Sequence, residues 1–482
     1  MSLSSAMNIA VSGLAANSRA SEVVAGNVAN ALTEDYARRS LSLSSVSLGG
    51  TGGGVRVDGV SRQVDPAVLT ARRGADAAVA GATVRGDFYA GFETALGLPG
   101  EPGALTTQIA GLKAALLDAA SRPDSDAGLQ AVLDAAADLA EGLNALSDHV
   151  QDARLQADAA IADQVATLNA NLQRIDSLNT DIVTVGATGG DPSALMDERQ
   201  RLIDEIAVIV PLREVPGELG QVTLYSEGGL LLLDNTPVTF GFDPAGTVTE
   251  AMTVEGGALS GLTVNGQAIS TGETGLIGGG ALSAGFAVRD DLAVEAQAQL
   301  DAIARDLVER LAAADPTLAP GAGGLLTDGG AAFDSLNEAG LSARIAVNPL
   351  ADPAQGGDLW RIRDGLGAAA EGEAGQSALL LALADALAAE VPPASGAFTG
   401  TARSAGGLAA ELLSQVSGDR LSAEDDLTVA RSQRDAFAAT LARNGVDTDA
   451  EMQALLLIER AYAANAQVIS AIDEMLQRIL EI

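Results

Sequence analysis

The chain of 482 residues contains no cysteine and a single histidine, His149. Without cysteine it can form no disulfide, carry no thiol nucleophile and bind no metal through sulfur. A single histidine leaves no paired imidazoles for a metal and little acid–base chemistry near neutral pH. We therefore expect neither a metal site nor a cofactor.

Positive charge is scarce. Lysine and arginine together number 28 against 64 acidic residues, which gives a net charge of −36 and a pI near 4.1. A nucleic-acid-binding protein needs a basic face to neutralise phosphates, and docking on anionic lipid needs one too. The charge therefore argues against both nucleic acid and membrane as partners.

Aromatic residues make up only 3% of the chain, yet the hydrophobic fraction is 47%, so the composition is that of a folded protein. No apolar run approaches the roughly 18 residues of a membrane-spanning helix. The first basic residue is Arg19, whereas a Sec signal begins with a positive segment. We expect a protein that is cytosolic, or exported without a cleaved signal peptide.

Both ends carry apolar or small residues at the three- and four-residue spacing of a coiled-coil seam. The N-terminal seam contains Leu3, Met7, Ala10, Leu14, Asn17, Ser21, Val24, Val28 and Ala31. The C-terminal seam contains Leu455, Ile458, Tyr462, Asn465, Ile469, Ile472, Leu476 and Ile479. The polar Asn465 is expected to set the register. We predict that the C-terminal apolar residues become buried only on assembly, against the N-terminal helix or a neighbour.

A joint between two helices precedes the C-terminal seam. Asn444 and Gly445 are typical of a helix stop, and that helix is expected to begin near Ser422. The spacing of Thr448 and Glu451 predicts a capping box for the next helix.

The middle of the chain changes from helical to strand periodicity and back. An apolar stripe over residues 129–185 predicts one long helix, and a second helix follows Asp191. From 212 to about 284 the period is two, with Asn265-Gly266 as a hairpin turn. The expected fold is mainly α, with terminal coiled-coil-like helices, a long helical shaft and an inserted antiparallel β lobe.

We divide the chain into four parts on this basis. They are a terminal helical assembly domain (1–32 and 445–482), a helical shaft (33–211, 285–314 and 366–444), the inserted β domain (212–284) and an irregular Gly/Pro-rich segment (315–365).

Catalytic motifs are missing. The only lysine, Lys113, is followed by Ala114, so no P-loop can form, and no Gly-x-Ser-x-Gly elbow occurs. The glycine cluster 49–54 favours a flexible turn. The acidic pairs at 124–126 and 447–449 fit helix capping better than calcium loops, because they lack the later glycine and glutamate. We expect a protein that is not an enzyme.

Two terminal motifs resemble those of bacterial flagellar axial proteins. The segment from Gly26 to Arg38 resembles their Asn-Asn-Ile-Ala-Asn-x-x-Thr-x-Gly-Tyr-x-Arg signature. The segment from Tyr462 to Leu476 resembles their Tyr-x-Ala-Asn-Ala-x-x-Ile-x-x-x-Asp-Glu-Met-Leu signature. Within that superfamily, three further segments resemble the hook-associated protein 1 family. They are residues 195–206, residues 54–65 and the pair Arg72-Arg73.

The resemblance implies a structural subunit of the hook–filament junction, needed for flagellum assembly and motility. It further implies type III export, an extracellular place in the flagellum, and a homo-oligomer in the flagellar axis. The implied partners are the hook protein, the second junction protein and an export chaperone on the C-terminal helix. A rod or hook subunit, or an enzyme carried by the β insert, remains an alternative.

The candidate site is an assembly interface. It comprises Leu3, Met7, Leu14, Val24, Val28, Leu455, Ile458, Tyr462, Asn465, Ile469, Ile472, Leu476 and Ile479.

Overall fold

The computed structural model describes residues 3–33, 36–48, 51–398 and 400–480. The chain divides into two compact units. Unit 1 comprises Met1–Val79, Thr167–Thr239 and Val429–Ile482, and unit 2 comprises Ala80–Ala166 and Phe240–Thr428. Glu34, Asp35, Gly49 and Gly50, which belong to two of the sequence motifs, lie outside the described residues.

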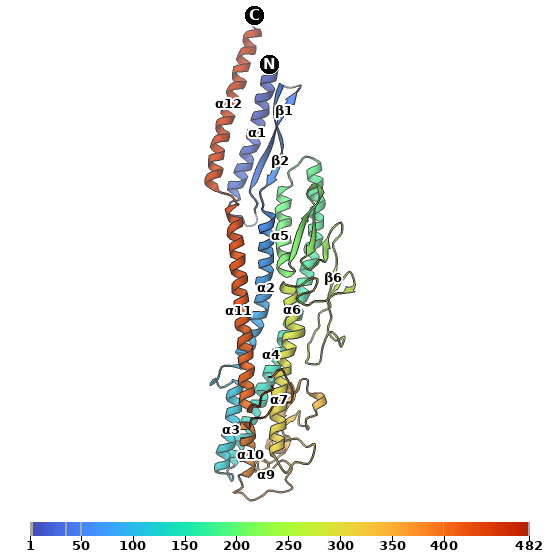
Figure 1. Cartoon of the computed structure of the whole chain (residues 1–482), viewed down its shortest axis with the longest axis vertical. Helices are drawn as coiled ribbons and strands as arrows, with labels where there is room; N and C mark the ends of the chain where they lie inside the picture. The colour runs from blue at the N-terminus through green and yellow to red at the C-terminus, as the bar shows by residue number, and fades with distance from the viewer. Residues whose placement is uncertain (1–2, 34–35, 49–50, 399, 481–482) are drawn as a thin grey trace. The chain divides into compact units, whose positions relative to one another are not determined.

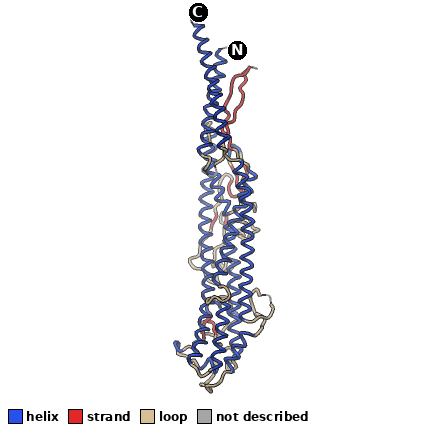
Figure 2. Tube along the Cα trace, turned by 90° about the vertical axis from the view of Figure 1, so that its left-hand side faces the viewer, coloured by secondary structure: helices blue, strands red, loops and turns tan. Residues whose placement is uncertain are grey.

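Unit 1 contains the two terminal helices, a long β-hairpin and a small three-stranded sheet (Figures 1 and 2). Its complete elements are α1 (Leu3–Ala29), β1 (Arg39–Leu48), β2 (Thr51–Arg62), α5 (Ser193–Ile209), β3 (Leu212–Pro216), β4 (Val222–Ser226), β5 (Leu231–Leu233) and α12 (Thr448–Leu480). The helices α2 (Pro66–Leu96), α4 (Asp126–Ala187) and α11 (Ala405–Arg443) contribute residues to both units.

The hairpin of β1 and β2 corrects the prediction that residues 33–211 are helical. Its antiparallel register runs from Arg39 opposite Arg62 to Leu48 opposite Thr51, with two irregularities. The period-two alternation of serine with leucine or valine in β1 is a strand pattern, and β1 and β2 form a two-stranded sheet. The glycines at 52–54, expected in a flexible turn, lie within β2.

Unit 2 is built around the apolar faces of long helices. Its remaining elements are α3 (Leu105–Ser121), β6 (Phe240–Gly241), β7 (Thr263–Val264), β8 (Gln267–Ala268), α6 (Ala281–Ala287), α7 (Ala293–Ala314), β9 (Leu326–Asp328), α8 (Leu341–Arg344), β10 (Ile345–Val347), α9 (Trp360–Asp364) and α10 (Ala378–Ala388). One core cluster joins residues of α2, α3, α4, α7, α10 and α11. Leu139 and Leu143 of α4 are fully buried in it.

An ionic cluster is buried in unit 2 where the backbone between α6 and α7 forms one turn of π-helix, Val288–Leu292. Arg289 donates to Asp158 at 2.6 Å, and both side chains are at most 1% exposed. Arg154 donates to the backbone carbonyls of Arg289, Thr249 and Met252. The cluster therefore ties the loop after β6 to α4.

The fold class expected from the sequence is confirmed. The long helix α4 covers 62 residues, and Asn265 and Gly266 both have positive φ, as a type I′ hairpin turn requires. The β residues of 212–284 form two three-stranded antiparallel sheets, β3–β4–β5 and β6–β7–β8, one in each unit. The helix α11 begins at Ala405, well before the expected Ser422.

The four-part division of the chain stays a prediction, since the two compact units have other boundaries. Among the residues that the structure describes, no helix combines the length and apolarity needed to cross a membrane.

Candidate assembly interface

The terminal helices α1 and α12 lie side by side within unit 1 and run in opposite directions (Figure 1). They meet at Gly13, where an added Cβ would lie 2.8 Å from Nδ2 of Asn465. A larger residue at this position would force the Asn465 amide to move. Gly13 therefore lets Asn465, the polar residue of the C-terminal seam, enter the contact between the two helices.

The thirteen predicted interface residues differ in how far the single chain covers them. Val24 and Ile472 are buried, at 7% and 3% exposure. The half-buried residues are Leu3, Met7, Leu14, Val28, Leu455, Ile458, Asn465 and Ile469. The exposed residues are Tyr462, Leu476 and Ile479. Burial of Ile472 within one chain corrects the expectation that this residue is covered only on assembly, because α1 already supplies a partner helix.

A second apolar stripe on α12 was missed in the sequence. Its members follow a strict 4-3-4-3-4 spacing, and all of them are exposed: Leu457, Ala461, Ala464, Val468, Ala471 and Met475. Leu457, Val468 and Met475 are 64%, 46% and 46% exposed. The signal was present as a second heptad-like register, shifted from the seam. Since α1 meets only the seam, this second stripe has no cover in a single chain.

The N-terminal seam also holds a buried amide group without a partner. Nδ2 of Asn17 is buried and has no hydrogen bond within the described part of the chain. A buried unpaired amide group costs roughly 1–3 kcal/mol. A seam that is complete in the single chain would not leave this cost in place.

The loop after α1 is held by Asn27, which is only 1% exposed. Its Nδ2 donates to the carbonyl of Arg39 at 2.9 Å, and its Oδ1 accepts the Arg39 N–H at 2.9 Å. The hydroxyl of Tyr36 donates to the same Oδ1 at 3.0 Å. Burial raises the pKa of this hydroxyl, against the lowering effect of Arg39, so that it stays protonated and donates. Asn27 thus fixes where β1 begins.

The joint before α12 is built differently from the predicted capping box. Oδ1 of Asp447 accepts the N–H groups of Asp449 and Ala450 at 3.0 and 3.1 Å, so Asp447 is the cap. Glu451 is buried and accepts from Nε of Arg38 at 2.7 Å. The predicted capping box is therefore wrong, because Glu451 pairs with the loop after α1.

The segment of α5 that carries the family motif anchors the hairpin and the start of α2. Asp197 accepts from Arg39 and Arg62, the first and last paired residues of the hairpin, each at 2.8 Å. Asp204 accepts from Arg72 and from Arg73, which is itself buried. Acidic residues of α5 therefore connect three separate parts of unit 1.

The residues of this interface supply structural contacts and an apolar surface. Nowhere in the described ranges do three or more His, Asp or Glu side chains gather so that they could hold a metal ion.

Two family models match the chain. Residues 96–315 match the flagellar hook-associated protein FlgK helical domain, and residues 439–482 match the flagellar basal body rod FlgEFG protein C-terminal. The second match covers the whole of α12.

Curated relatives carry the same family name. Flagellar hook-associated protein 1 of Salmonella typhimurium is 27% identical over 241 residues, which are 48% of this chain and 43% of the relative. The Escherichia coli K12 protein of that name is 27% identical over 215 residues, or 43% of this chain and 39% of the relative. The matched region thus spans less than half the length of these relatives.

The chain is also similar to the solved structure of the flagellar hook junction protein FlgK from Burkholderia pseudomallei. The TM-score is 0.45 at 20% identity, covering 54% of this chain and 47% of that one. The helical-domain match and the curated relatives make this chain similar to flagellar hook-associated protein 1, and its C-terminal end is similar to the flagellar basal body rod proteins.

Proposed function

We propose that this chain is a structural subunit of the bacterial flagellum that joins the hook to the filament. Copies of the chain pack through α1 and α12 along the flagellar axis. The hook protein contacts them on one side and the second hook–filament junction protein on the other. The names of the curated relatives support this placement.

The observation that carries the proposal is the uncovered stripe of α12. Fully burying one large apolar side chain contributes about 1.5–3 kcal/mol. In a single chain Leu457, Val468 and Met475 are 64%, 46% and 46% exposed, so each lacks a large part of this stabilisation. A neighbouring copy in an axial array would cover them, and the same surface would repeat in every subunit.

The route to the flagellum is part of the proposal. The chain leaves the cytoplasm through the type III export apparatus and acts outside the cell. An export chaperone covers the apolar stripes of α12 before export. The absence of cysteine supports export as an unfolded chain, since no disulfide has to be broken first.

The test uses purified protein added to hooks from a strain that lacks this protein. Val468→Asp combined with Met475→Asp adds two charges to the uncovered stripe. Because both positions are exposed, the substitutions leave the single chain folded. Gln467→Asp combined with Ser470→Asp is the matched control, because it adds the same charge to exposed polar positions of the same helix.

Wild type and control are expected to cap the hooks and to support filament growth, and the stripe variant is expected to fail. Circular dichroism confirms that each variant is folded. Normal filament growth with the stripe variant would overturn the proposed interface. Gold-labelled protein found in the rod, instead of at the end of the hook, would overturn the junction role.

A further inference from the structure

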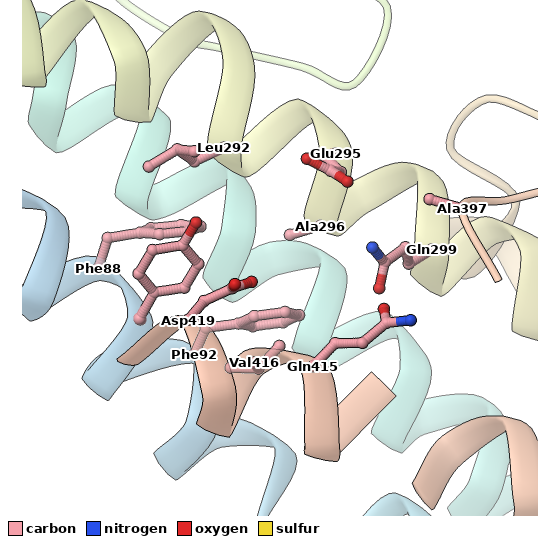
Figure 3. A pocket seen from close by; sticks show the side chains of 11 residues that line it. Phe88, Phe92, Leu292, Glu295, Ala296, Gln299, Ala397, Gln415, Val416 and Asp419 are labelled. Carbon is pink, nitrogen blue, oxygen red and sulfur yellow. The ribbon is translucent and has the colours of Figure 1, made fainter. Parts of the chain in front are cut away.

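A small cavity in unit 2 has one wall of aromatic rings. It has a volume of about 270 Å³ and opens between α2, α7 and α11 (Figure 3). Phe88, Tyr89 and Phe92 of α2 line it, with ring centroids 5.4 Å apart for Phe88–Tyr89 and 6.2 Å apart for Phe88–Phe92. Aromatic residues are only 3% of this chain, so three in one wall is a marked concentration.

Two carboxylates without partners lie at the same cavity. Glu295 of α7 and Asp419 of α11 line it, and neither has an ion pair or side-chain hydrogen bond among the described residues. The nearby arginines are engaged elsewhere: Arg420 contacts Glu93 at 2.6 Å and also Glu424, and Arg85 pairs with Glu273. The cavity therefore carries two negative charges that no side chain neutralises.

A buried amide completes the lining. Gln299 is 7% exposed, and its side chain has no hydrogen bond to any residue that the structure describes. In Figure 3 the amides of Gln299 and Gln415 approach each other from α7 and α11 at one end of the cavity. The amide of Gln299 faces the cavity, and a ligand with N–H donors would supply a partner for its oxygen.

We propose that this cavity binds a guanidinium group, presented by an arginine side chain of another protein subunit. A guanidinium is a planar cation with five N–H donors, which suit two carboxylates and the amide oxygens. Its flat face stacks on aromatic rings. A volume of about 270 Å³ is at the small end for ligand sites and suits one side chain. This binding does not depend on the junction role.

Direct titration of the purified full chain tests the proposal. The probes are the capped tripeptide Ala-Arg-Ala, the same peptide with lysine, and methylguanidine, each followed by saturation-transfer NMR and calorimetry. The arginine peptide is expected to bind saturably, at least about tenfold more tightly than the lysine peptide, because only the guanidinium can form paired hydrogen bonds with a carboxylate.

Glu295→Gln combined with Asp419→Asn is expected to weaken binding of the arginine peptide by at least about tenfold, since both charge-assisted contacts are lost. Asp425→Asn combined with Asp426→Asn is the matched control, because it removes two exposed carboxylates of α11 outside the cavity and should leave the Kd unchanged.

Equal affinity for the two peptides, or equal weakening by control and cavity variants, would overturn the guanidinium site. If methylguanidine bound but the arginine peptide did not, the assignment of the ligand to a protein side chain would be overturned. All four substituted carboxylates are exposed, so the variants remain folded and the comparison stays valid.

Discussion

The side chain of Asn27 joins the end of α1 to the loop that follows it. It is buried at the end of α1 and bonds both backbone groups of Arg39 as well as the Tyr36 hydroxyl. Asparagine is suited to this position because one side chain supplies a donor and an acceptor together. An aspartate could accept but not donate, and an alanine could do neither.

We predict that Asn27→Ala lowers the free energy of unfolding by roughly 1–3 kcal/mol, because buried polar groups lose their partners. Asn8→Ala, at an exposed position of the same helix, is the control and should change little. Urea unfolding followed by circular dichroism measures both. Equal effects for the two variants would contradict the role given to Asn27.

Asp158 holds the buried arginine of unit 2. Its two carboxylate oxygens accept from Arg289 and from the N–H of Ala245, each at 2.6 Å. Without Asp158, Arg289 keeps only Asp290 as a charged partner and the N–H of Ala245 loses its acceptor, so Asp158→Ala should cost roughly 1–3 kcal/mol. Asp152→Ala, exposed on the same helix, should cost far less. A similar shift of the urea midpoint for both would show that the buried pair is not required.

The Tyr89 hydroxyl should make the stability of the folded chain depend on pH. Burial, with added repulsion from Asp419 and Glu295, raises the pKa of its hydroxyl from 10.0 to about 12. The folded state thus favours the neutral phenol, and this stabilisation is complete below pH 10 and is lost as pH rises from 10 to about 12. Tyr89→Phe should therefore lose less stability than wild type across that interval. If the melting temperatures of the two proteins fell equally with rising pH across that interval, the raised pKa would be contradicted.

At the scale of elements, the hairpin depends on its contact with α1. Oγ of Ser12 accepts the N–H of Val55 at 3.1 Å, and a Cβ on the neighbouring Gly54 would collide with that oxygen. Gly54 also has a φ of +106°, where other residues are strained. Glycine at this one position therefore allows the strand to lie against the helix.

Gly54→Ala should detach the middle of β2 from α1 and cost roughly 1–3 kcal/mol, from backbone strain together with the lost contact. Gly52→Ala in the same strand meets open space and serves as the control. Amide hydrogen exchange at Val55 reports the change directly, since its N–H bonds to Ser12. Unchanged protection in Gly54→Ala would contradict the contact.

The sequence predicted elements well where the signal was local. The long stripe of α4, the Asn265-Gly266 turn and the terminal helices follow from periodicity and turn chemistry alone. The alternation of β1 is equally local, but it lies inside the range 33–211 that is predicted as helical shaft. The second register of α12 was also visible, and the stronger seam obscured it.

Contacts between distant residues could not be predicted in this way. Arg38 and Glu451 are 413 residues apart, and Asp204 lies 131 residues from Arg73. Periodicity indicates which face of a helix is buried, but not which partner faces it. For Glu451 the local capping pattern even indicated the wrong partner, because Glu451 pairs with Arg38 and Asp447 forms the cap.

At the scale of the whole molecule, assembly has to overcome charge. Each copy carries −36, so neighbouring copies repel one another unless salt screens them. A repeated apolar surface is the means that this chain offers against that repulsion. The seam is partly covered by α1, whereas the stripe from Leu457 to Met475 is exposed and is the surface that we propose a neighbour covers.

A cryo-electron microscopy map of the hook–filament junction, at a resolution that shows side chains, tests assembly through this stripe most directly. We predict that α12 of each copy contacts a neighbouring copy through Val468 and Met475, while Asn465 stays opposite Gly13 of its own chain. A map in which Val468 and Met475 face solvent in every copy would contradict assembly through this stripe.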